Sequence, residues 1–416
     1  MYRKFLNSAA LAVLTGAFFL GGTTNVLAAP SSRDIQAMKA EIEALKQQNE
    51  ALSQRLEQME QGMAGQNERL QAQETKLEEQ KAKESAEEGS DLIGNIGKYI
   101  SLHGSVDADI DFYRDFAHNN SSDINVDAVE LEFEAKLSEW ARAVALLKYE
   151  DGEDNIFLDE GYIVLGGTES FPAFFKLGKY VTPFGDYTTH MVDDPFTQTL
   201  GEINDGAATI GFSKNGFTGT VFAYNGVDEH DDEHEINGVG AALRYDREEE
   251  DGLSFSAGLG LVSNLATAGG IKDVLPRNAD DKAVMTDTVA GLNVHGSIGY
   301  AGFSALAEYT TALDNFEAAD LEYRGDGAQP AALNTELAYG TEIAGLDTEF
   351  ALGFQKTWEA LAVEVPEFRY SAAVALGIFE GTTLTLEYFF DRDYDEADGG
   401  TGEDGHGFTT RLSYAF

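Results

Sequence analysis

The feature that most constrains this chain is an alternation of polar and apolar residues, which runs from Tyr99 to the last residue in blocks of about ten. In Val129–Leu137, apolar side chains occupy every second position, and three glutamates and a lysine occupy the positions between them. Successive side chains of a strand point to opposite faces, so this block predicts a strand with one apolar and one charged face. Repeated blocks of this kind are typical of a transmembrane barrel with lipid outside and water inside.

The links between the predicted strands alternate in length. Short links fall near Ser138, Glu169 and Asn215, for example, and long ones near Asn119 and over 183–204, with a short exception near Gly152. Short periplasmic turns and long outer loops are expected of an outer-membrane barrel, and an even strand count places both of its ends in the periplasm. A soluble sandwich or propeller is the alternative, although neither needs links that alternate. We predict sixteen antiparallel strands, centred near residues 105, 131, 145, 161, 176, 209, 221, 240, 258, 294, 306, 338, 351, 373, 386 and 411.

The chain closes on an aromatic residue, Phe416, after an alternating run that begins at Leu412. This ending resembles the closing strand of bacterial outer-membrane proteins, which the outer-membrane assembly machinery recognises. The resemblance implies that machinery as a partner, together with the lipid of the outer membrane of a Gram-negative bacterium.

The first residues predict a secretory signal over 1–29, with Arg3 and Lys4 before an apolar run and small residues before the cleavage site. A membrane anchor is the alternative, but the run is short and three glycines interrupt it. We assign 31–87 to a periplasmic coiled-coil stem, 88–98 to a linker and 99–416 to the barrel.

The stem prediction depends on a seam that starts at Ile35 and repeats every 3.5 residues, as in coiled coils. Asn49 at a seam position would fix the register and the oligomeric state. The stem therefore predicts a homo-oligomer, trimer or dimer. A lone solvated helix is the alternative.

Composition excludes several classes of protein. The chain has 28 basic and 73 acidic residues, a formal net charge of −45, which argues against nucleic acid as a partner because binding to phosphates needs a basic face. It has no cysteine, so disulfides and thiolate metal sites are excluded. We expect no cofactor.

A long loop between two predicted strands, Ala173–Tyr180 and Ala207–Ser213, is the candidate functional segment. Structureless loops of such length are uncommon in compact domains and usually have a function. We predict that it folds over or into the pore and narrows it. The candidate constriction residues are Asp186, His190, Asp193, Asp194 and Glu202.

Selectivity of a pore comes from charges that face its lumen. The alternation of the strands assigns a mixed set to that face, although each residue could instead be solvated or paired across the wall. The pore-lining candidates are Arg142, Lys148, Lys176, Arg244, Arg369, Arg411, Glu130, Glu132, Glu134, Asp347 and Glu349. The acidic excess predicts a preference for cations.

Two charge runs in predicted outer loops have other interpretations. Glu229–Glu235 contains carboxylates and imidazoles that suit a divalent metal, but its spacing matches no defined site, so we interpret it as solvated and predict no metal site. Asp391–Glu396 is interpreted in the same way.

An enzyme is disfavoured because no Gly-x-Ser-x-Gly motif occurs and no motif places a serine beside the 7 histidines. A structural protein that tethers the membrane through its stem is a third class.

Three stretches carry a family resemblance: Asp159–Gly167, Lys176–Gly185 and Asp194–Glu202. They resemble the LbtU-type siderophore porins, and the order of signal, coiled coil and barrel matches too. The resemblance implies an outer-membrane channel that takes up ferric siderophores without TonB coupling. A looser similarity is to stem-bearing anion porins, which often form trimers, so a general or ion-selective trimeric porin is the alternative function.

The residues themselves favour passive passage of a small solute. Barrels of about sixteen strands leave an aqueous channel, whereas those near twenty-two carry a plug. Between the predicted signal and the first strand lie only about 70 residues, and they read as helical. We therefore expect no plug domain.

Overall fold

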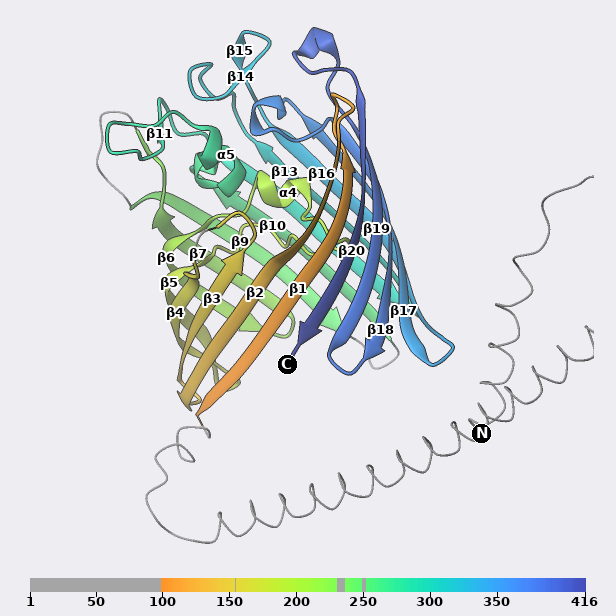
Figure 1. Cartoon of the computed structure of the whole chain (residues 1–416). Helices are drawn as coiled ribbons and strands as arrows, with labels where there is room; N and C mark the ends of the chain where they lie inside the picture. Colours follow the sequence, from red (N-terminus) through yellow and green to blue (C-terminus); the bar gives the residue numbers. More distant parts are fainter. Residues whose placement is uncertain (1–98, 154, 230–235, 249–251) are drawn as a thin grey trace, which may run out of the picture. The chain divides into compact units, whose positions relative to one another are not determined.

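The computed structural model describes residues 99–153, 155–229, 236–248 and 252–416. The predicted signal, stem and linker lie outside these residues. Sixteen antiparallel strands form one barrel, which closes where β1 pairs with β20 (Figure 1). The barrel strands are β1 (Ile100–Arg114), β2 (Asn120–Ser138), β3 (Ala141–Glu150), β4 (Phe157–Thr168), β5 (Phe171–Val181), β6 (Asn204–Lys214), β7 (Phe217–Asn225), β9 (Ile236–Glu248), β10 (Leu253–Val262), β12 (Gly291–Tyr300), β13 (Phe303–Ala312), β16 (Ala331–Ile343), β17 (Leu346–Trp358), β18 (Phe368–Phe379), β19 (Thr382–Arg392) and β20 (Asp404–Ala415).

The strand prediction is confirmed: each of the predicted centres falls within one of these strands. The loops hold smaller elements that the sequence pattern did not indicate. These are the short strands β8 (Asp228–Glu229), β11 (Val284–Met285), β14 (Glu322–Tyr323) and β15 (Asp326–Gly327), and the helices α4 (Phe196–Thr199), η2 (Leu265–Thr267), α5 (Gly269–Val274), η3 (Leu361–Val363) and η4 (Glu396–Asp398). Among the described residues, no helix is long and apolar enough to cross a membrane.

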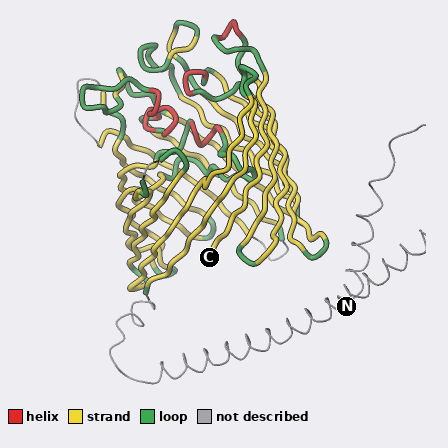
Figure 2. Tube along the Cα trace, in the orientation of Figure 1, coloured by secondary structure: helices red, strands yellow, loops and turns green. Residues whose placement is uncertain are grey.

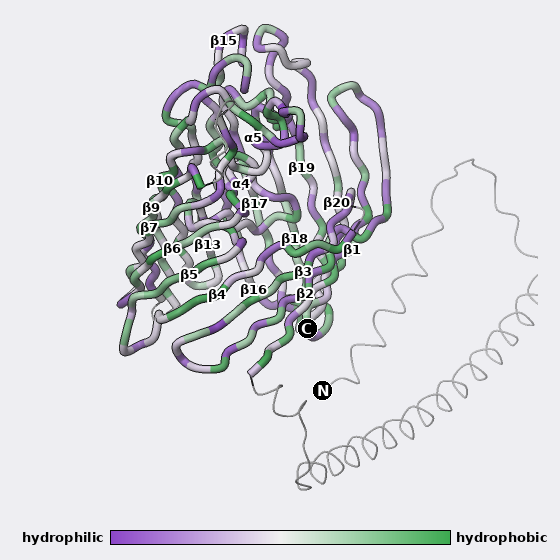
Figure 3. Tube along the Cα trace, turned by 90° about the vertical axis from the view of Figure 1, so that its left-hand side faces the viewer, coloured by the Kyte–Doolittle hydropathy of each residue, from purple (hydrophilic) through white to green (hydrophobic). Residues whose placement is uncertain are grey.

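The strands have an apolar outer face and a more polar inner face. On β17, Leu352 is 63% exposed on the outside, whereas Gln355, on the inner face, is 2% exposed. The same alternation is visible along the strands in Figure 3. Large apolar side chains that remain exposed in an isolated barrel are those a hydrocarbon layer would cover.

The two ends of the barrel differ in their connections. Two-residue turns join strands at the end where β1 begins and β20 finishes, and three of them, such as Asn215–Gly216, have positive φ at both residues. Two-residue hairpins favour this geometry because it matches the twist of the strands, and Asn-Gly adopts it readily. The long loops gather at the other end (Figure 2).

The interpretation of Asp391–Glu396 as a solvated loop run is wrong for its first part, although Asp395 and Glu396 are exposed after the end of β19. Asp391 and Arg392 belong to β19, and Asp391 is 2% exposed. Tyr394 is also buried, with its hydroxyl bonded to Thr357. A run of charges in sequence does not reveal that alternate members point inward, where other strands supply partners.

Candidate functional site

The segment between β5 and β6, residues 182–203, lies inside the barrel rather than above it (Figures 1 and 2). We call it the internal loop. It contains the single turn α4 and otherwise has no regular structure. Its polar contacts come from β9, β13 and β16–β20, so one segment touches much of the inner wall.

Three buried glutamates of the wall accept hydrogen bonds from the internal loop. Glu308 of β13 accepts from the backbone N–H groups of Asp186 at 2.9 Å and Tyr187 at 3.1 Å. Glu336 of β16 accepts from the N–H of His190 at 2.6 Å and from the hydroxyl of Thr189 at 2.7 Å. These carboxylates replace the acceptors that a helix or sheet would give to the loop backbone.

The third glutamate, Glu387 of β19, accepts from the N–H of Val192, and Gln355 of β17 accepts from the N–H of Phe196 at 2.7 Å. Glu308, Glu336 and Glu387 are 4%, 2% and 1% exposed. Carboxylates are rarely buried so completely unless they have partners. Hydrogen bonds to a charged group contribute about 1.5–3 kcal/mol each, so this set holds the loop firmly against one side of the wall.

Arginines add ion pairs to the same arrangement. Arg244 of β9 contacts Asp186 at 3.0 Å. Arg369 of β18 contacts Asp193 at 2.6 Å and Asp391 at 2.7 Å. Its guanidinium also lies over the rings of a loop phenylalanine and a wall phenylalanine, Phe196 and Phe389. The positive charges of both arginines are therefore balanced by carboxylates.

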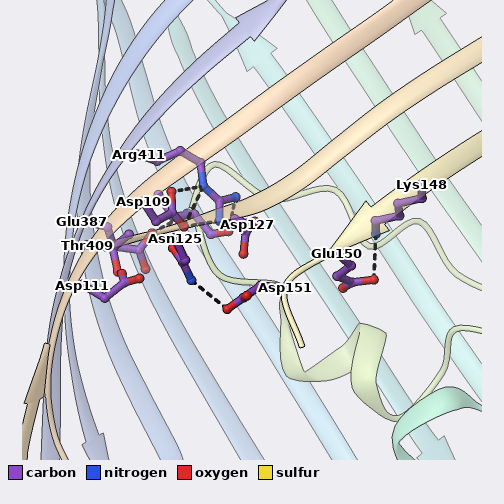
Figure 4. Close-up of polar contacts among 11 residues, drawn as sticks. Asp109, Asp111, Asn125, Asp127, Lys148, Glu150, Asp151, Glu387, Thr409 and Arg411 are labelled. Carbon is purple, nitrogen blue, oxygen red and sulfur yellow. Dashed lines mark hydrogen bonds and ion pairs between the residues drawn. The ribbon is translucent and has the colours of Figure 1, made fainter. Parts of the chain in front are cut away.

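Arg411 of β20 connects the strands at the closure of the barrel (Figure 4). It contacts Asp109 of β1 at 2.7 Å and Asp127 of β2 at 2.5 Å, and it donates to the carbonyl of Val192 at 3.4 Å. This residue thus links the first, second and last strands of the barrel to the internal loop.

His190 fixes the middle of the internal loop between two strands. Its Nδ1 lies 2.9 Å from Glu349 of β17, and its Nε2 lies 2.9 Å from the Ser304 hydroxyl of β13. Both ring nitrogens therefore have partners, which sets the orientation of the ring.

The other face of the internal loop carries carboxyls that the wall does not neutralise. The Asp194 side chain is exposed to the lumen, but the surrounding wall partly desolvates its carboxyl and so raises its pKa. The Lys148 ammonium of β3 opposes this rise in pKa. Burial, followed by the nearby carboxylates of Asp194 and Asp159, raises the pKa of Glu202 to about 7. Lys148 itself contacts Glu150 at 3.4 Å (Figure 4).

An apolar cluster lies behind the loop, at the end with the long connections. Phe184 and Leu200 of the internal loop pack there with Leu265 and Ile271 of the β10–β12 connection. The carbonyl of Glu202 accepts from the N–H of Gly269 at 3.0 Å. Wall carboxylates on one side and an outer loop on the other therefore confine the internal loop.

The structure brings four pairs of sequence-predicted site residues together. Glu134 contacts Arg142 on the wall. The other three pairs include the internal loop or hold it: Asp186 with Arg244, His190 with Glu349, and Asp193 with Arg369. Arg411 joins them through the loop backbone. The other pore-lining candidates, together with Glu134 and Arg142, are distributed over the wall. Glu130, Glu132 and Glu134 lie on β2, Arg142 and Lys148 on β3, Lys176 on β5, and Asp347 on β17 beside a two-residue turn.

Sequence reasoning did not identify Glu336, Gln355 and Asp127 as partners of this arrangement. Glu336 and Gln355 occupy inward positions of their strands, so the alternation could have placed them in the lumen. Asp127 stands at an irregularity of the β1–β2 register, where alternation does not predict the direction of a side chain.

No group of three or more histidine, aspartate or glutamate residues within the described segments could hold a metal ion. Most of the Glu229–Glu235 run lies outside those segments.

No protein-family model matches the sequence. It is 26% identical over 303 residues to a UPF0422 protein of Coxiella burnetii, covering 71% of this chain and 64% of that relative. It is 27% identical over 318 residues to a UPF0422 protein of Legionella pneumophila strain Lens, covering 71% of this chain and 59% of that one. The chain thus spans less than two thirds of the length of these curated relatives.

Solved structures share the barrel. An anion-selective porin from Comamonas acidovorans gives a TM-score of 0.52 at 14% identity, covering 76% of this chain and 99% of that one. OprB of Pseudomonas putida gives 0.55 at 9% identity, covering 79% and 97%. The outer-membrane channel DcaP of Acinetobacter baumannii gives 0.51 at 14% identity, covering 76% and 97%. At these identities the likeness shows the fold, and the fold is that of outer-membrane porins.

Glu336 should be needed to hold the internal loop in one position. In Glu336→Gln, one of the two loop donors faces an amide NH₂ group instead of an oxygen, which costs roughly 1–3 kcal/mol. We expect a looser internal loop and larger open-channel current noise in single-channel recordings. Glu342→Gln is the matched control, because Glu342 is an exposed residue near the turn of the same strand. Equal noise in the two variants would contradict the anchoring role.

Proposed function

We propose that this protein is an outer-membrane porin through which small solutes pass passively, without TonB coupling. The observation that carries the proposal is the internal loop, held by wall residues inside a closed sixteen-strand barrel. Barrels of this size hold an aqueous channel when nothing fills them. A segment that occupies part of the lumen narrows such a channel, and charges on its free face select what passes. The porin-like fold indicates a channel rather than an enzyme.

The orientation follows from the asymmetry of the barrel ends. In outer-membrane barrels the short turns face the periplasm, so the turn near Asn215 and the end of β20 would lie there. Phe416 is exposed and pairs through its backbone with Gly104 of β1. It remains the residue that we propose for recognition by the assembly machinery. A periplasmic stem that joins copies of the chain, as a trimer or dimer, belongs to the same proposal.

The proposed selectivity is for cations. The arginines closest to the internal loop, Arg244, Arg369 and Arg411, all have carboxylate partners. Asp194 and Glu202 face the remaining space with Lys148 as their neighbouring cation. The balance at the narrowest level is therefore negative, which attracts cations and repels anions.

A ferric siderophore is the more specific cargo that we propose. The family resemblance over 159–202 favours it, and that range includes the internal loop. An acidic constriction would admit neutral or cationic complexes more readily than polyanionic ones. A general ion-selective porin requires no such cargo. A structural tether acting through the stem would require no conductance at all.

Recording from the full chain in planar bilayers distinguishes these functions. We expect stable conductance and a reversal potential, across a KCl gradient, that indicates K⁺ preference. A ferric siderophore that blocks the current would favour the specific cargo, and an unaffected current would favour the general porin. A complete absence of conductance in correctly folded protein would overturn the proposed function.

Neutralising the free face of the internal loop should weaken the selectivity. In Asp194→Asn, a carboxylate next to the permeating ions is lost without loss of a wall contact, so the K⁺/Cl⁻ permeability ratio should fall. Asp193→Asn should lower the ratio too, because it removes a carboxylate that balances the positive charge of Arg369. Asp314, in an outer loop, provides the control substitution Asp314→Asn, which should leave the ratio unchanged. Unchanged reversal potentials in the two loop variants would contradict a constriction at this level.

The selectivity should also depend on pH. The pKa of Glu202 is raised to about 7, so its carboxyl is charged above that pH and neutral below it. We expect the K⁺/Cl⁻ permeability ratio to fall as the pH is lowered from about 8 to about 6, one unit on either side of the pKa. Glu202→Gln should largely remove this step. A step of equal size in that variant would assign it to another group.

A further inference from the structure

Three cations form a row across adjacent strands, close to the end with the two-residue turns. Lys136 of β2 pairs in register with Arg142 of β3, which pairs with Val164 of β4, which pairs with Lys176 of β5. Cross-strand neighbours lie about 4.5–5.5 Å apart between Cβ atoms. The row is unusual in a chain with 73 acidic and 28 basic residues.

Like charges directly opposite each other destabilise a sheet, so Lys136 and Arg142 should not be neighbours without a compensating partner. Arg142 contacts Glu134 at 3.6 Å. Neither Lys136 nor Lys176 forms an ion pair with any residue that the structure describes. Glu134 therefore pairs with one cation of the row, and the other two have no ion-pair partner among the described residues.

Two tyrosine rings position Lys176. Its Nζ lies 3.7 Å from the ring centroids of both Tyr162 and Tyr180. The hydroxyl of Tyr180 lies 2.8 Å from that of Thr209, which fixes the ring. Burial acts against the charge of the ammonium, and the nearby Glu160 carboxylate favours that charge without pairing with it. The two rings thus hold the lysine in one place without an ion pair.

A pocket of about 310 Å³ opens in front of this row. Its lining combines the three cations with Phe174, the backbone of Gly166 and Gly167, and the hydroxyl-bearing Ser138 and Ser213. Glu139 is the one carboxylate in the lining. The cations occupy inward positions of their strands, so the pocket belongs to the lumen rather than to the lipid-facing surface.

We propose that this pocket is an anion-binding site at the periplasmic mouth of the pore, which takes a small oxyanion such as a carboxylate or phosphate group. The inference rests on the proposed function for its position in a channel. Ammonium and guanidinium groups are the donors that bind such oxygens in proteins. A volume at the small end of ligand pockets suits a small organic acid or an inorganic ion.

The site gives the pore charges of opposite sign in series: carboxyls at the internal loop and cations at the mouth beyond it. Ions of either sign then meet different barriers from the two sides. The current–voltage curve of a single channel should therefore be asymmetric, and an anion that binds at the mouth should act from that side only.

Side-specific block of the full chain in planar bilayers tests the site, with citrate and inorganic phosphate as separate probes. We expect one of them to reduce the current when added to one side only. The apparent Kd should rise about tenfold for each cation removed in Lys136→Gln and Lys176→Gln, and more in the double variant. Lys176→Arg should retain the block. Lys272→Gln is the matched control, because it removes a cation near the opposite mouth, where Lys272 contacts Asp205.

The outcomes separate the two proposals. Conductance with no block by either anion, with equal block from both sides, or with equal block in the double variant would overturn the site while leaving the porin in place. Tighter block by citrate would identify organic acids as the ligand class, and tighter block by phosphate would identify inorganic oxyanions. Isothermal titration in detergent measures binding without conductance, and absence of heat for both probes would overturn the site even if no channel forms.

Discussion

The structure depends on one requirement: backbone N–H groups that are buried against the inner wall of the barrel need acceptors. The internal loop does not pair with a strand, so its backbone N–H groups donate hydrogen bonds to Glu308, Glu336 and Glu387 instead. An unsatisfied buried donor costs about 1–3 kcal/mol, so these three carboxylates decide where the loop can lie. Small movements of the loop would break several bonds at once, which makes its position well defined.

This solution also determines the electrostatics of the lumen. The loop buries the glutamates that accept its hydrogen bonds. Aspartates neutralise the arginines that contact the loop, as Asp193 and Asp391 do for Arg369. In the channel that we propose, the charges left to face solutes are a smaller set, led by Asp194 and Glu202 on the free face. The total charge of the chain is therefore a poor guide to selectivity, and the few charges not used for anchoring are a better one.

Local sequence patterns were sufficient for the wall and insufficient for the site. Alternation with period two and turn residues such as Asn215–Gly216 placed the strands, because both act over a few neighbours. The long link after β5 marked the internal loop. Strand alternation also assigns Glu308 and Glu387 to the lumen. It could not predict that they bind the loop, since they lie 122 and 195 residues from the backbone groups they bind. The assignment of Asp391 to a solvated run failed for the same reason, because its partner Arg369 is on another strand.

The central claim is that the free face of the internal loop borders the narrowest part of an open path. Because the chain has no cysteine, a single one can be introduced at that face as Asp194→Cys and modified with a bulky thiol reagent during a single-channel recording. We predict an abrupt, lasting loss of most of the current on modification, and no change in the unsubstituted protein. An unaltered current after complete labelling would contradict the claim, because it would place the path of the ions elsewhere in the barrel.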